Sequence, residues 1–215
     1  QLKIMLAKEI ADSSTELPVS NHISRTEIGQ SLQNILANKI EEIRQTISLM
    51  DEKQLNTILD DIKSARIVQF VAVGNTIPVA LDGAFKFNEI GIKAVAGTIW
   101  ETQLAFSLSL SRDDVLIAIS NSGESRQVVK MVQEAGKNNV ITIGITNNPN
   151  STVGRCVDYH IQTATREKLF LNEICFSRVS AMTVIEVLYL FLTVGQERSY
   201  DRMSKCESLI ADEKL

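Results

Sequence analysis

The residues best able to do chemistry form a short polar run, Ser120-Asn121-Ser122-Gly123-Glu124-Ser125. This run lies between an apolar segment at 115–120 and a helical pattern at 124–137. Backbone N–H groups at a helix start are unpaired and carry the positive end of the helix dipole, so they favour an anion. Three hydroxyls add neutral donors, and Gly123 lets the backbone approach a ligand closely. An ordinary turn and helix cap use the same residue types, but a cap needs only one hydroxyl. The run therefore predicts a site for a small anion.

A second polar junction, Gly74-Asn75-Thr76, follows the apolar segment at 67–73 and precedes Pro78. Taken alone, this junction is what an ordinary turn before a helix contains. Neither junction is a nucleotide motif, since the chain has no G-x-G-x-x-G and no G-x-x-x-x-G-K-[ST]. A small monophosphate, held by hydroxyls and backbone amides, is the ligand that these residue types favour.

The two junctions need a scaffold, which the spacing of apolar residues predicts. Five short runs rich in Val and Ile alternate with helical patterns at 77–90, 99–110 and 124–137; the runs are 67–73, 93–97, 115–120, 140–146 and 159–163. Near-continuous apolar strands that alternate with helices are typical of a parallel sheet covered on both faces. We therefore expect an α/β fold with a doubly wound, five-stranded parallel sheet, in which ligands lie at the carboxyl ends of the strands.

Further helices are expected on either side of this region. Two amphipathic helices precede the first strand: one carries apolar residues at helical spacing from Leu32 to Met50, and the other starts at Asp51. A helix at about 172–194 is apolar almost all round, which favours burial in the fold or in a subunit interface.

Composition excludes several classes of protein. The 215 residues carry a formal net charge of -4 and no basic stripe, which argues against nucleic-acid binding across the whole chain. Three widely spaced cysteines indicate neither a disulfide framework nor a metal site, and they fit a reducing compartment. The longest apolar stretch is too short for a membrane span, and no signal peptide is visible. We expect a cytoplasmic protein without metal or cofactor and without a membrane partner.

The segment DVLIAISNSGESRQVV (114–129) resembles the signature of the sugar isomerase (SIS) domain, which binds phosphosugars. Segments 65–95, 141–159 and 165–182 resemble the rest of this domain in RpiR-type transcription regulators, and the leading QLKIMLAKEI is similar to the last helix of their helix-turn-helix domain. The resemblance implies a SIS-type, flavodoxin-like fold with four parts. These are the end of a helix-turn-helix domain at 1–11, a linker at 12–24, the SIS domain at 25–198 and a C-terminal tail at 199–215.

The resemblance also implies a ligand and a set of binding residues. The ligand is a sugar phosphate effector that controls operator binding through the N-terminal head, which this chain largely lacks, in a homodimer or homotetramer. The phosphate-binding hydroxyls are those of Thr76, Ser120, Ser122 and Ser125, helped by amides near Gly74 and Gly123. Asn75 and Asn121 are placed to meet sugar hydroxyls. Arg178 could reach the ligand or a partner subunit, or form an ordinary ion pair. Glu101 stands where the family often has His, and Leu171-Asn172-Glu173 replaces a common Arg-Ser-Gly, so the identity of the sugar stays open.

Two other classes of function are considered. SIS domains also occur in aldose–ketose isomerases, which need a base to take a proton next to a carbonyl. The candidate groups are Glu89, Glu101, Glu173 and His160, and no two of them form a readable pair, so we expect no catalytic residue and no enzyme. A dimerisation module would explain the amphipathic helices at 30–64 and the apolar helix, but not three hydroxyls around Gly123.

Overall fold

A computed structural model of the chain describes residues 22–165, 178–194 and 197–211. The described helices are α2 (Ile28–Ser48), α3 (Glu52–Ser64), the 3-10 turn η1 (Gly74–Thr76), α4 (Ile77–Glu89), α5 (Trp100–Ser107), α6 (Arg126–Lys137), α7 (Thr152–Cys156), α8 (Val179–Thr193) and α9 (Glu197–Ala211). The strands are β1 (Val68–Ala72), β2 (Ala94–Ala96), β3 (Val115–Ile119), β4 (Ile141–Thr146) and β5 (Tyr159–Gln162).

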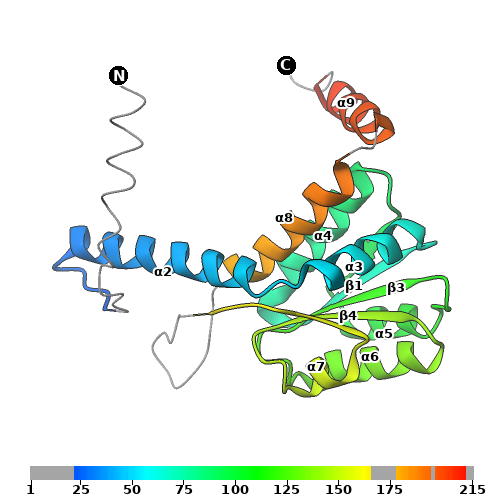
Figure 1. Cartoon of the computed structure of the whole chain (residues 1–215), viewed down its shortest axis with the longest axis horizontal. Coiled ribbons are helices and arrows are strands. Elements are labelled where there is room, and N and C mark those ends of the chain that lie inside the picture. The colour runs from blue at the N-terminus through cyan, green and yellow to red at the C-terminus, as the bar shows by residue number, and fades with distance from the viewer. Residues whose placement is uncertain (1–21, 166–177, 195–196, 212–215) are drawn as a thin grey trace.

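The five strands form one parallel sheet in the order β2-β1-β3-β4-β5. Every residue of β1 and β3 is buried, which is why these strands read as continuous apolar runs. Successive side chains point to opposite faces, so Phe70 lies in one core and Val71 in the other. Helices α3, α4 and α8 cover the first face, while α5, α6 and α7 cover the second (Figure 1). The predicted doubly wound sheet is confirmed.

The elements around the sheet agree with the sequence-based expectations, with some additions. All five strands lie within the predicted runs, and α4, α5 and α6 lie within the predicted helical segments. The short α7 was not predicted. The apolar helix is described from Val179 to Thr193, and residues 172–177 of its predicted range lie outside the described residues, as do 1–21 of the predicted head and linker. The predicted polar C-terminal segment is the helix α9. None of the described helices is long and apolar enough to cross a membrane.

The edge of the sheet where the strands begin is held by a buried carboxylate. Asp114, just before β3, accepts hydrogen bonds from Arg66 Nε at 2.9 Å and Nη2 at 2.7 Å, and from the Ser111 amide at 2.8 Å. Burial of Asp114 opposes its ionisation. The hydrogen bond and charge of Arg66, together with those from Ser111, outweigh burial and lower the pKa of this carboxyl. The pair therefore ties the starts of β1 and β3 together.

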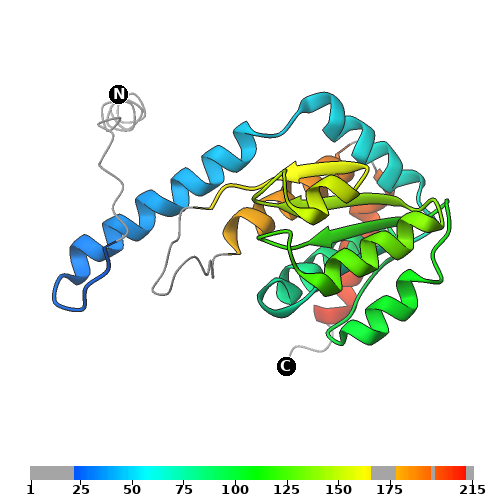
Figure 2. The same ribbon diagram turned by 90° about the horizontal axis from the view of Figure 1, so that it is seen from below.

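Helix α2 is amphipathic as predicted, but it buries its polar face and exposes its apolar face, which is the reverse of the usual arrangement. Its polar residues are buried, namely Ser31, Asn34, Asn38, Glu42 and Thr46. Seven apolar residues face outward instead and are between 37% and 62% exposed: Ile28, Leu32, Ile35, Leu36, Ile40, Ile43 and Ile47. In Figures 1 and 2, the N-terminal half of α2 extends away from the sheet. By contrast, α3 buries its apolar face, including Ile58 and Ile62, in the core.

Candidate anion site at the switch point of the sheet

The two polar junctions lie side by side at the switch point of the sheet. There β2 lies on one side of β1, and the strands that follow it lie on the other. β1 pairs with β2 on one side and β3 on the other, with Ala72 next to Ile119 at their ends. The loops that leave these ends are linked directly, since the Thr76 hydroxyl lies 3.0 Å from the Val73 carbonyl and 3.1 Å from that of Ile119. A doubly wound sheet binds ligands at such a switch point. Thr76 directs its proton to these carbonyls, so its donation to a phosphate stays a prediction.

The N-terminus of α6 has uncommitted donors. Ser125 is the N-cap residue, yet its side chain makes no capping hydrogen bond. The first backbone hydrogen bond of this helix runs from the Val129 amide to the Ser125 carbonyl. The preceding amides of the first turn are therefore without an intrahelical partner. The hydroxyls of Ser120 and Ser125 make no hydrogen bond to any residue that the structure describes, whereas the Ser122 hydroxyl accepts from the Glu124 amide at 3.3 Å. Amides and hydroxyls thus remain available to an anion at this point.

Gly123 fixes the path of this loop. Its φ of 69° lies in the left-handed region, and a Cβ added there would lie 2.1 Å from Ser151 Oγ. The loop is also bonded on both sides of the glycine, from the Gly123 amide to the Ser120 carbonyl and from the Val153 amide to the Gly123 carbonyl. Only glycine combines this backbone conformation with so close an approach to α7.

Glu124 is turned away from the donors of α6. Its carboxylate accepts from the Thr152 amide at 2.9 Å and the Thr152 hydroxyl at 2.6 Å, on the first residue of α7. These two hydrogen bonds, the hydroxyl's first, lower the pKa of Glu124. The carboxylate therefore stays ionised while it fastens the loop to α7.

The other predicted binding residues differ in how close they lie to this loop. Gly74, with a φ of 58°, and Asn75 form the exposed turn η1 beside it, and Asn121 carries a carbonyl that accepts from the Asn147 amide. Glu101 is exposed in the first turn of α5, beyond the end of β2. Arg178 is exposed at the start of α8. No contact among the described residues brings Glu101 or Arg178 to the Ser120 loop, so both stay predictions.

A buried glutamine that sequence reasoning missed holds α5 against β1. Gln103 donates from Nε2 to the Ala72 carbonyl at 3.0 Å and accepts from the Ala72 amide at 2.9 Å. Strand β2 is too short to reach Ala72. Gln103 therefore makes the hydrogen bonds that a neighbouring strand would otherwise make with this residue. Gln69 and Ser107 complete the network, with Gln69 Nε2 donating to the Gln103 carbonyl and the Ser107 hydroxyl to Gln69 Oε1. The network fixes the end of β1, from which the Gly74 turn departs. A glutamine inside an otherwise apolar strand, Gln69, was the available signal.

The groups considered for isomerase chemistry do not form a catalytic pair in the described residues. Glu89 ends α4, at the opposite edge of the sheet from the Ser120 loop. His160 is in β5, with its Nε2 2.8 Å from Thr146 Oγ1, and burial lowers its pKa. Glu173 lies outside the described residues. Glu101 lies beyond the end of β2, and among the described residues no hydrogen bond or ion pair joins it to His160 or Glu89.

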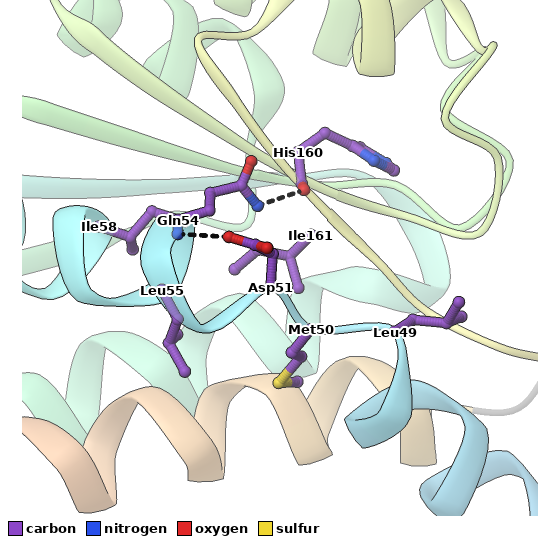
Figure 3. Close-up of a pocket in the computed structure, with 8 residues that line it drawn as sticks. All are labelled: Leu49, Met50, Asp51, Gln54, Leu55, Ile58, His160 and Ile161. Carbon is purple, nitrogen blue, oxygen red and sulfur yellow. Dashed lines mark hydrogen bonds between the residues drawn. The ribbon is translucent and has the colours of Figure 1, made fainter.

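A small hollow lies elsewhere, beneath the turn from α2 to α3. Its lining is Leu49, Met50, Asp51, Gln54, Leu55, Ile58, His160 and Ile161 (Figure 3). Its polar groups are already paired, because Asp51 accepts from the Gln54 amide and the Gln54 side chain donates to the His160 carbonyl. The imidazole of His160 points away from it (Figure 3). The hollow therefore offers no chemistry, and the described residues contain no group of side chains that could hold a metal ion.

Comparison with known proteins gives a consistent result. The family model of the SIS domain matches residues 61–191, which include both polar junctions. An uncharacterized HTH-type transcriptional regulator of Clostridium perfringens is 28% identical over 188 residues, which cover 87% of this chain and 67% of that regulator.

Solved structures share the fold. The Vibrio vulnificus NanR protein, complexed with ManNAc-6P, matches all of this chain and 75% of its own, with a TM-score of 0.78 and 18% identity. The sugar isomerase domain of an RpiR transcription factor from Sphaerobacter thermophilus matches 83% of this chain and 99% of its own, with a TM-score of 0.76 and 23% identity. A Listeria monocytogenes protein described provisionally as a sugar-phosphate isomerase has a TM-score of 0.72 at 17% identity, with 87% of this chain and 100% of its own covered.

Proposed function

The chain belongs to the SIS domain family, and from this premise we propose that it is the effector-sensing part of a transcription regulator. It binds a sugar phosphate, and the bound state controls how a helix-turn-helix head binds its operator, in a regulator of carbohydrate-metabolism genes that works in the cytoplasm. The residues at 1–11 are the end of that head, 12–24 are the linker, 25–198 are the sensing domain and 199–215 are a C-terminal tail. The similar HTH-type regulators and the ligand of NanR support this proposal.

The observation that carries the proposal is a pair of hydroxyls, Ser120 after β3 and Ser125 at the start of α6, that form no hydrogen bond within the described part of the chain. A phosphate group there accepts from the amides of the first turn and from Ser120, Ser122 and Ser125. The Thr76 hydroxyl is a further donor to the phosphate, and amides near Gly74 and Gly123 help to hold it. Asn75, Asn121, Glu101 and Arg178 are then the candidates for contacts with the sugar. Binding needs no metal and no cofactor in this scheme.

The effect of the ligand has a physical route to the N-terminal linker. Ala164 follows β5, and its amide donates to the Thr46 hydroxyl on α2 at 3.0 Å, while its carbonyl accepts from the Ser180 hydroxyl at the start of α8. The edge that would hold the ligand is thus bonded to the helix that leads back to the linker. A ligand shifts such an assembly only by its differential affinity for two states.

Thermal shift with and without sugar phosphates tests the effector site. A panel of hexose and N-acetylhexosamine 6-phosphates is compared with the same sugars lacking phosphate. At 100 times the dissociation constant a ligand stabilises by about 2.7 kcal/mol, which raises the Tm by roughly 5–10 °C. The double substitution Ser120→Ala with Ser125→Ala should abolish this rise. Ser109→Ala, an exposed hydroxyl at the opposite edge of the sheet, is the matched control and should retain it.

The outcomes separate the functions. A panel in which no sugar phosphate raises the Tm, or a double variant that responds like the wild type, contradicts the effector site. Conversion of an aldose phosphate to its ketose would instead identify the alternative, an aldose–ketose isomerase. A gel-shift assay with the full-length regulator and its operator then tests whether the ligand changes DNA binding, and an unchanged shift contradicts the regulatory part.

A further inference from the structure

Arg126 carries a positive charge at a point where the fold is already positive. It is the first residue of α6, directly after the N-cap residue Ser125, and it is exposed. The first turn of this helix contains no acidic residue. A cation is unfavourable at a helix N-terminus, because the helix dipole leaves partial positive charge on the unpaired amides there. The position of Arg126 therefore costs free energy as long as no anion is bound.

None of the described carboxylates forms an ion pair with Arg126. The acid nearest to it in the sequence is Glu124, whose carboxylate accepts two hydrogen bonds from Thr152 instead. The positive charge that acts on this carboxylate is that of Arg155, at the end of α7. Within the described part of the chain, the guanidinium of Arg126 is thus left without a counter-charge.

A second observation shows where a counter-charge would lie. Ser120 is only 6% exposed, yet its hydroxyl makes no hydrogen bond to any described residue. Its amide donates to the Ile145 carbonyl at 3.1 Å, so Ser120 continues β3 by one residue. Side chains alternate along a strand, and Ala118 lies in the core that α6 covers. The Ser120 hydroxyl is therefore on the same side of the sheet as α6 and points toward its start.

We propose that Arg126 binds the ligand of the effector site and selects a phosphate group that carries two negative charges, an inference that rests on the proposed function. The hydroxyls of Ser120 and Ser125 and the amides of α6 are neutral donors, which can hold any tetrahedral anion. The guanidinium adds a permanent charge and further N–H donors. A phosphate monoester is mostly a dianion at pH 7.5, because its second pKa is about 6. A sulfate monoester has the same shape but one charge, so Arg126 should distinguish the two.

An NMR titration of the 215-residue chain at pH 7.5 tests this selection without knowledge of the sugar. The probes are methyl phosphate and methyl sulfate, and both should shift the amide signals of the first turn of α6. We expect methyl phosphate to bind at least about fivefold more tightly, since a hydrogen bond between charged groups is stronger than one to a neutral group. Arg126→Gln should remove this preference, whereas Ser120→Ala should weaken the binding of both probes.

The matched control is Lys130→Gln. Lys130 is exposed on the same helix, one turn beyond Arg126, so this variant loses the same charge outside the first turn. It should bind both probes as the wild type does.

Thermal unfolding without ligand separates a binding role from a structural one. Arg126→Gln removes a cation from the start of α6, so the free variant should melt about 1–3 °C above the wild type. Weaker binding with a higher Tm is the expected combination. A residue that merely supports the loop would lower the affinity and the Tm together, and that result would overturn the proposal.

The other outcomes are equally distinct. An Arg126→Gln chain that still prefers methyl phosphate, or a Lys130→Gln chain that loses the preference, overturns the role of Arg126. The effector site still stands in either case if the response to a sugar phosphate depends on Ser120 and Ser125. If neither probe shifts the amides at the start of α6, the anion site itself is contradicted, and the role of Arg126 with it.

Discussion

Replacing three glycines by alanine, one at a time, separates two penalties in the candidate loop. One is the strain of a left-handed backbone, and the other is the steric crowding of an added Cβ. Gly123 has a φ of 69°, and a Cβ there would lie 2.1 Å from Ser151 Oγ and 2.5 Å from Ser151 Cβ. Gly74 has a φ of 58° but no atom within 4 Å of an added Cβ. Gly136, in α6, has neither a positive φ nor a neighbour within 4 Å. Substitution by Ala therefore adds backbone strain and crowding at Gly123, backbone strain alone at Gly74, and neither at Gly136.

The magnitudes follow from these contacts. A left-handed conformation costs an alanine about 1 kcal/mol. At Gly123, Ser151 must also move, and its hydroxyl then no longer caps α7 by accepting from the Gly154 amide at 3.1 Å. Loss of such a cap costs about 1 kcal/mol, so Gly123→Ala should lose roughly 2–3 kcal/mol in all. Gly136→Ala should instead gain about 0.5–1 kcal/mol, because alanine is the better helix former.

Differential scanning calorimetry gives the test. At about 2–4 °C per kcal/mol for a domain of this size, the expected order of Tm is Gly136→Ala, wild type, Gly74→Ala and Gly123→Ala. The last should lie roughly 5–10 °C below the wild type. A Gly123→Ala protein that melts with Gly74→Ala would show that Ser151 does not crowd the loop. One that melts with the wild type would refute the left-handed geometry as well.

Three further substitutions test the groups that hold the scaffold. Gln103→Leu leaves the buried amide and carbonyl of Ala72 without a partner, and urea unfolding should show a loss of about 2–4 kcal/mol. Asp114→Asn should lose about 1–3 kcal/mol at neutral pH. Because the pKa of Asp114 is lowered in the fold, the difference in stability between this variant and the wild type should have its full size above about pH 4. It should decrease as the pH falls through the pKa of the folded state. A difference that does not depend on pH would contradict the lowered pKa. The pKa of His160 is also lowered, so the unfolded chain binds this proton first and stability should decline as the pH falls below about 6.5. His160→Gln should remove that part of the decline, and an unchanged slope would contradict the lowering of the His160 pKa by burial.

The sheet could be predicted because its central strands β1, β3 and β4 are almost entirely buried. The five runs of Val and Ile leave few alternatives to a parallel sheet once helical patterns separate them. The sequence also indicates the two polar loops as candidates, and the strand order of the structure brings them together at the ends of β1 and β3. Gln69 in an apolar strand hints at a buried polar network, but the contacts of Gln103 with Ala72 could not be predicted because they depend on how far β2 extends. Nor could the sequence show that the Thr76 hydroxyl points to two carbonyls, because that depends on the spacing of the two loops.

In α2 the periodic pattern predicts an amphipathic helix, but it does not predict which face the rest of the chain covers. A stripe of apolar residues predicts that one face of a helix will be covered, and in α3 the covering partner is the core of the same chain. In α2 the inner face lies against α8 and against coil backbone, where the Ser24 amide and carbonyl, the His22 carbonyl and the Ala164 amide all need hydrogen-bond partners. Ser31, Asn34 and Thr46 supply them, which an apolar face could not do. The polar face is therefore the one that suits these backbone partners.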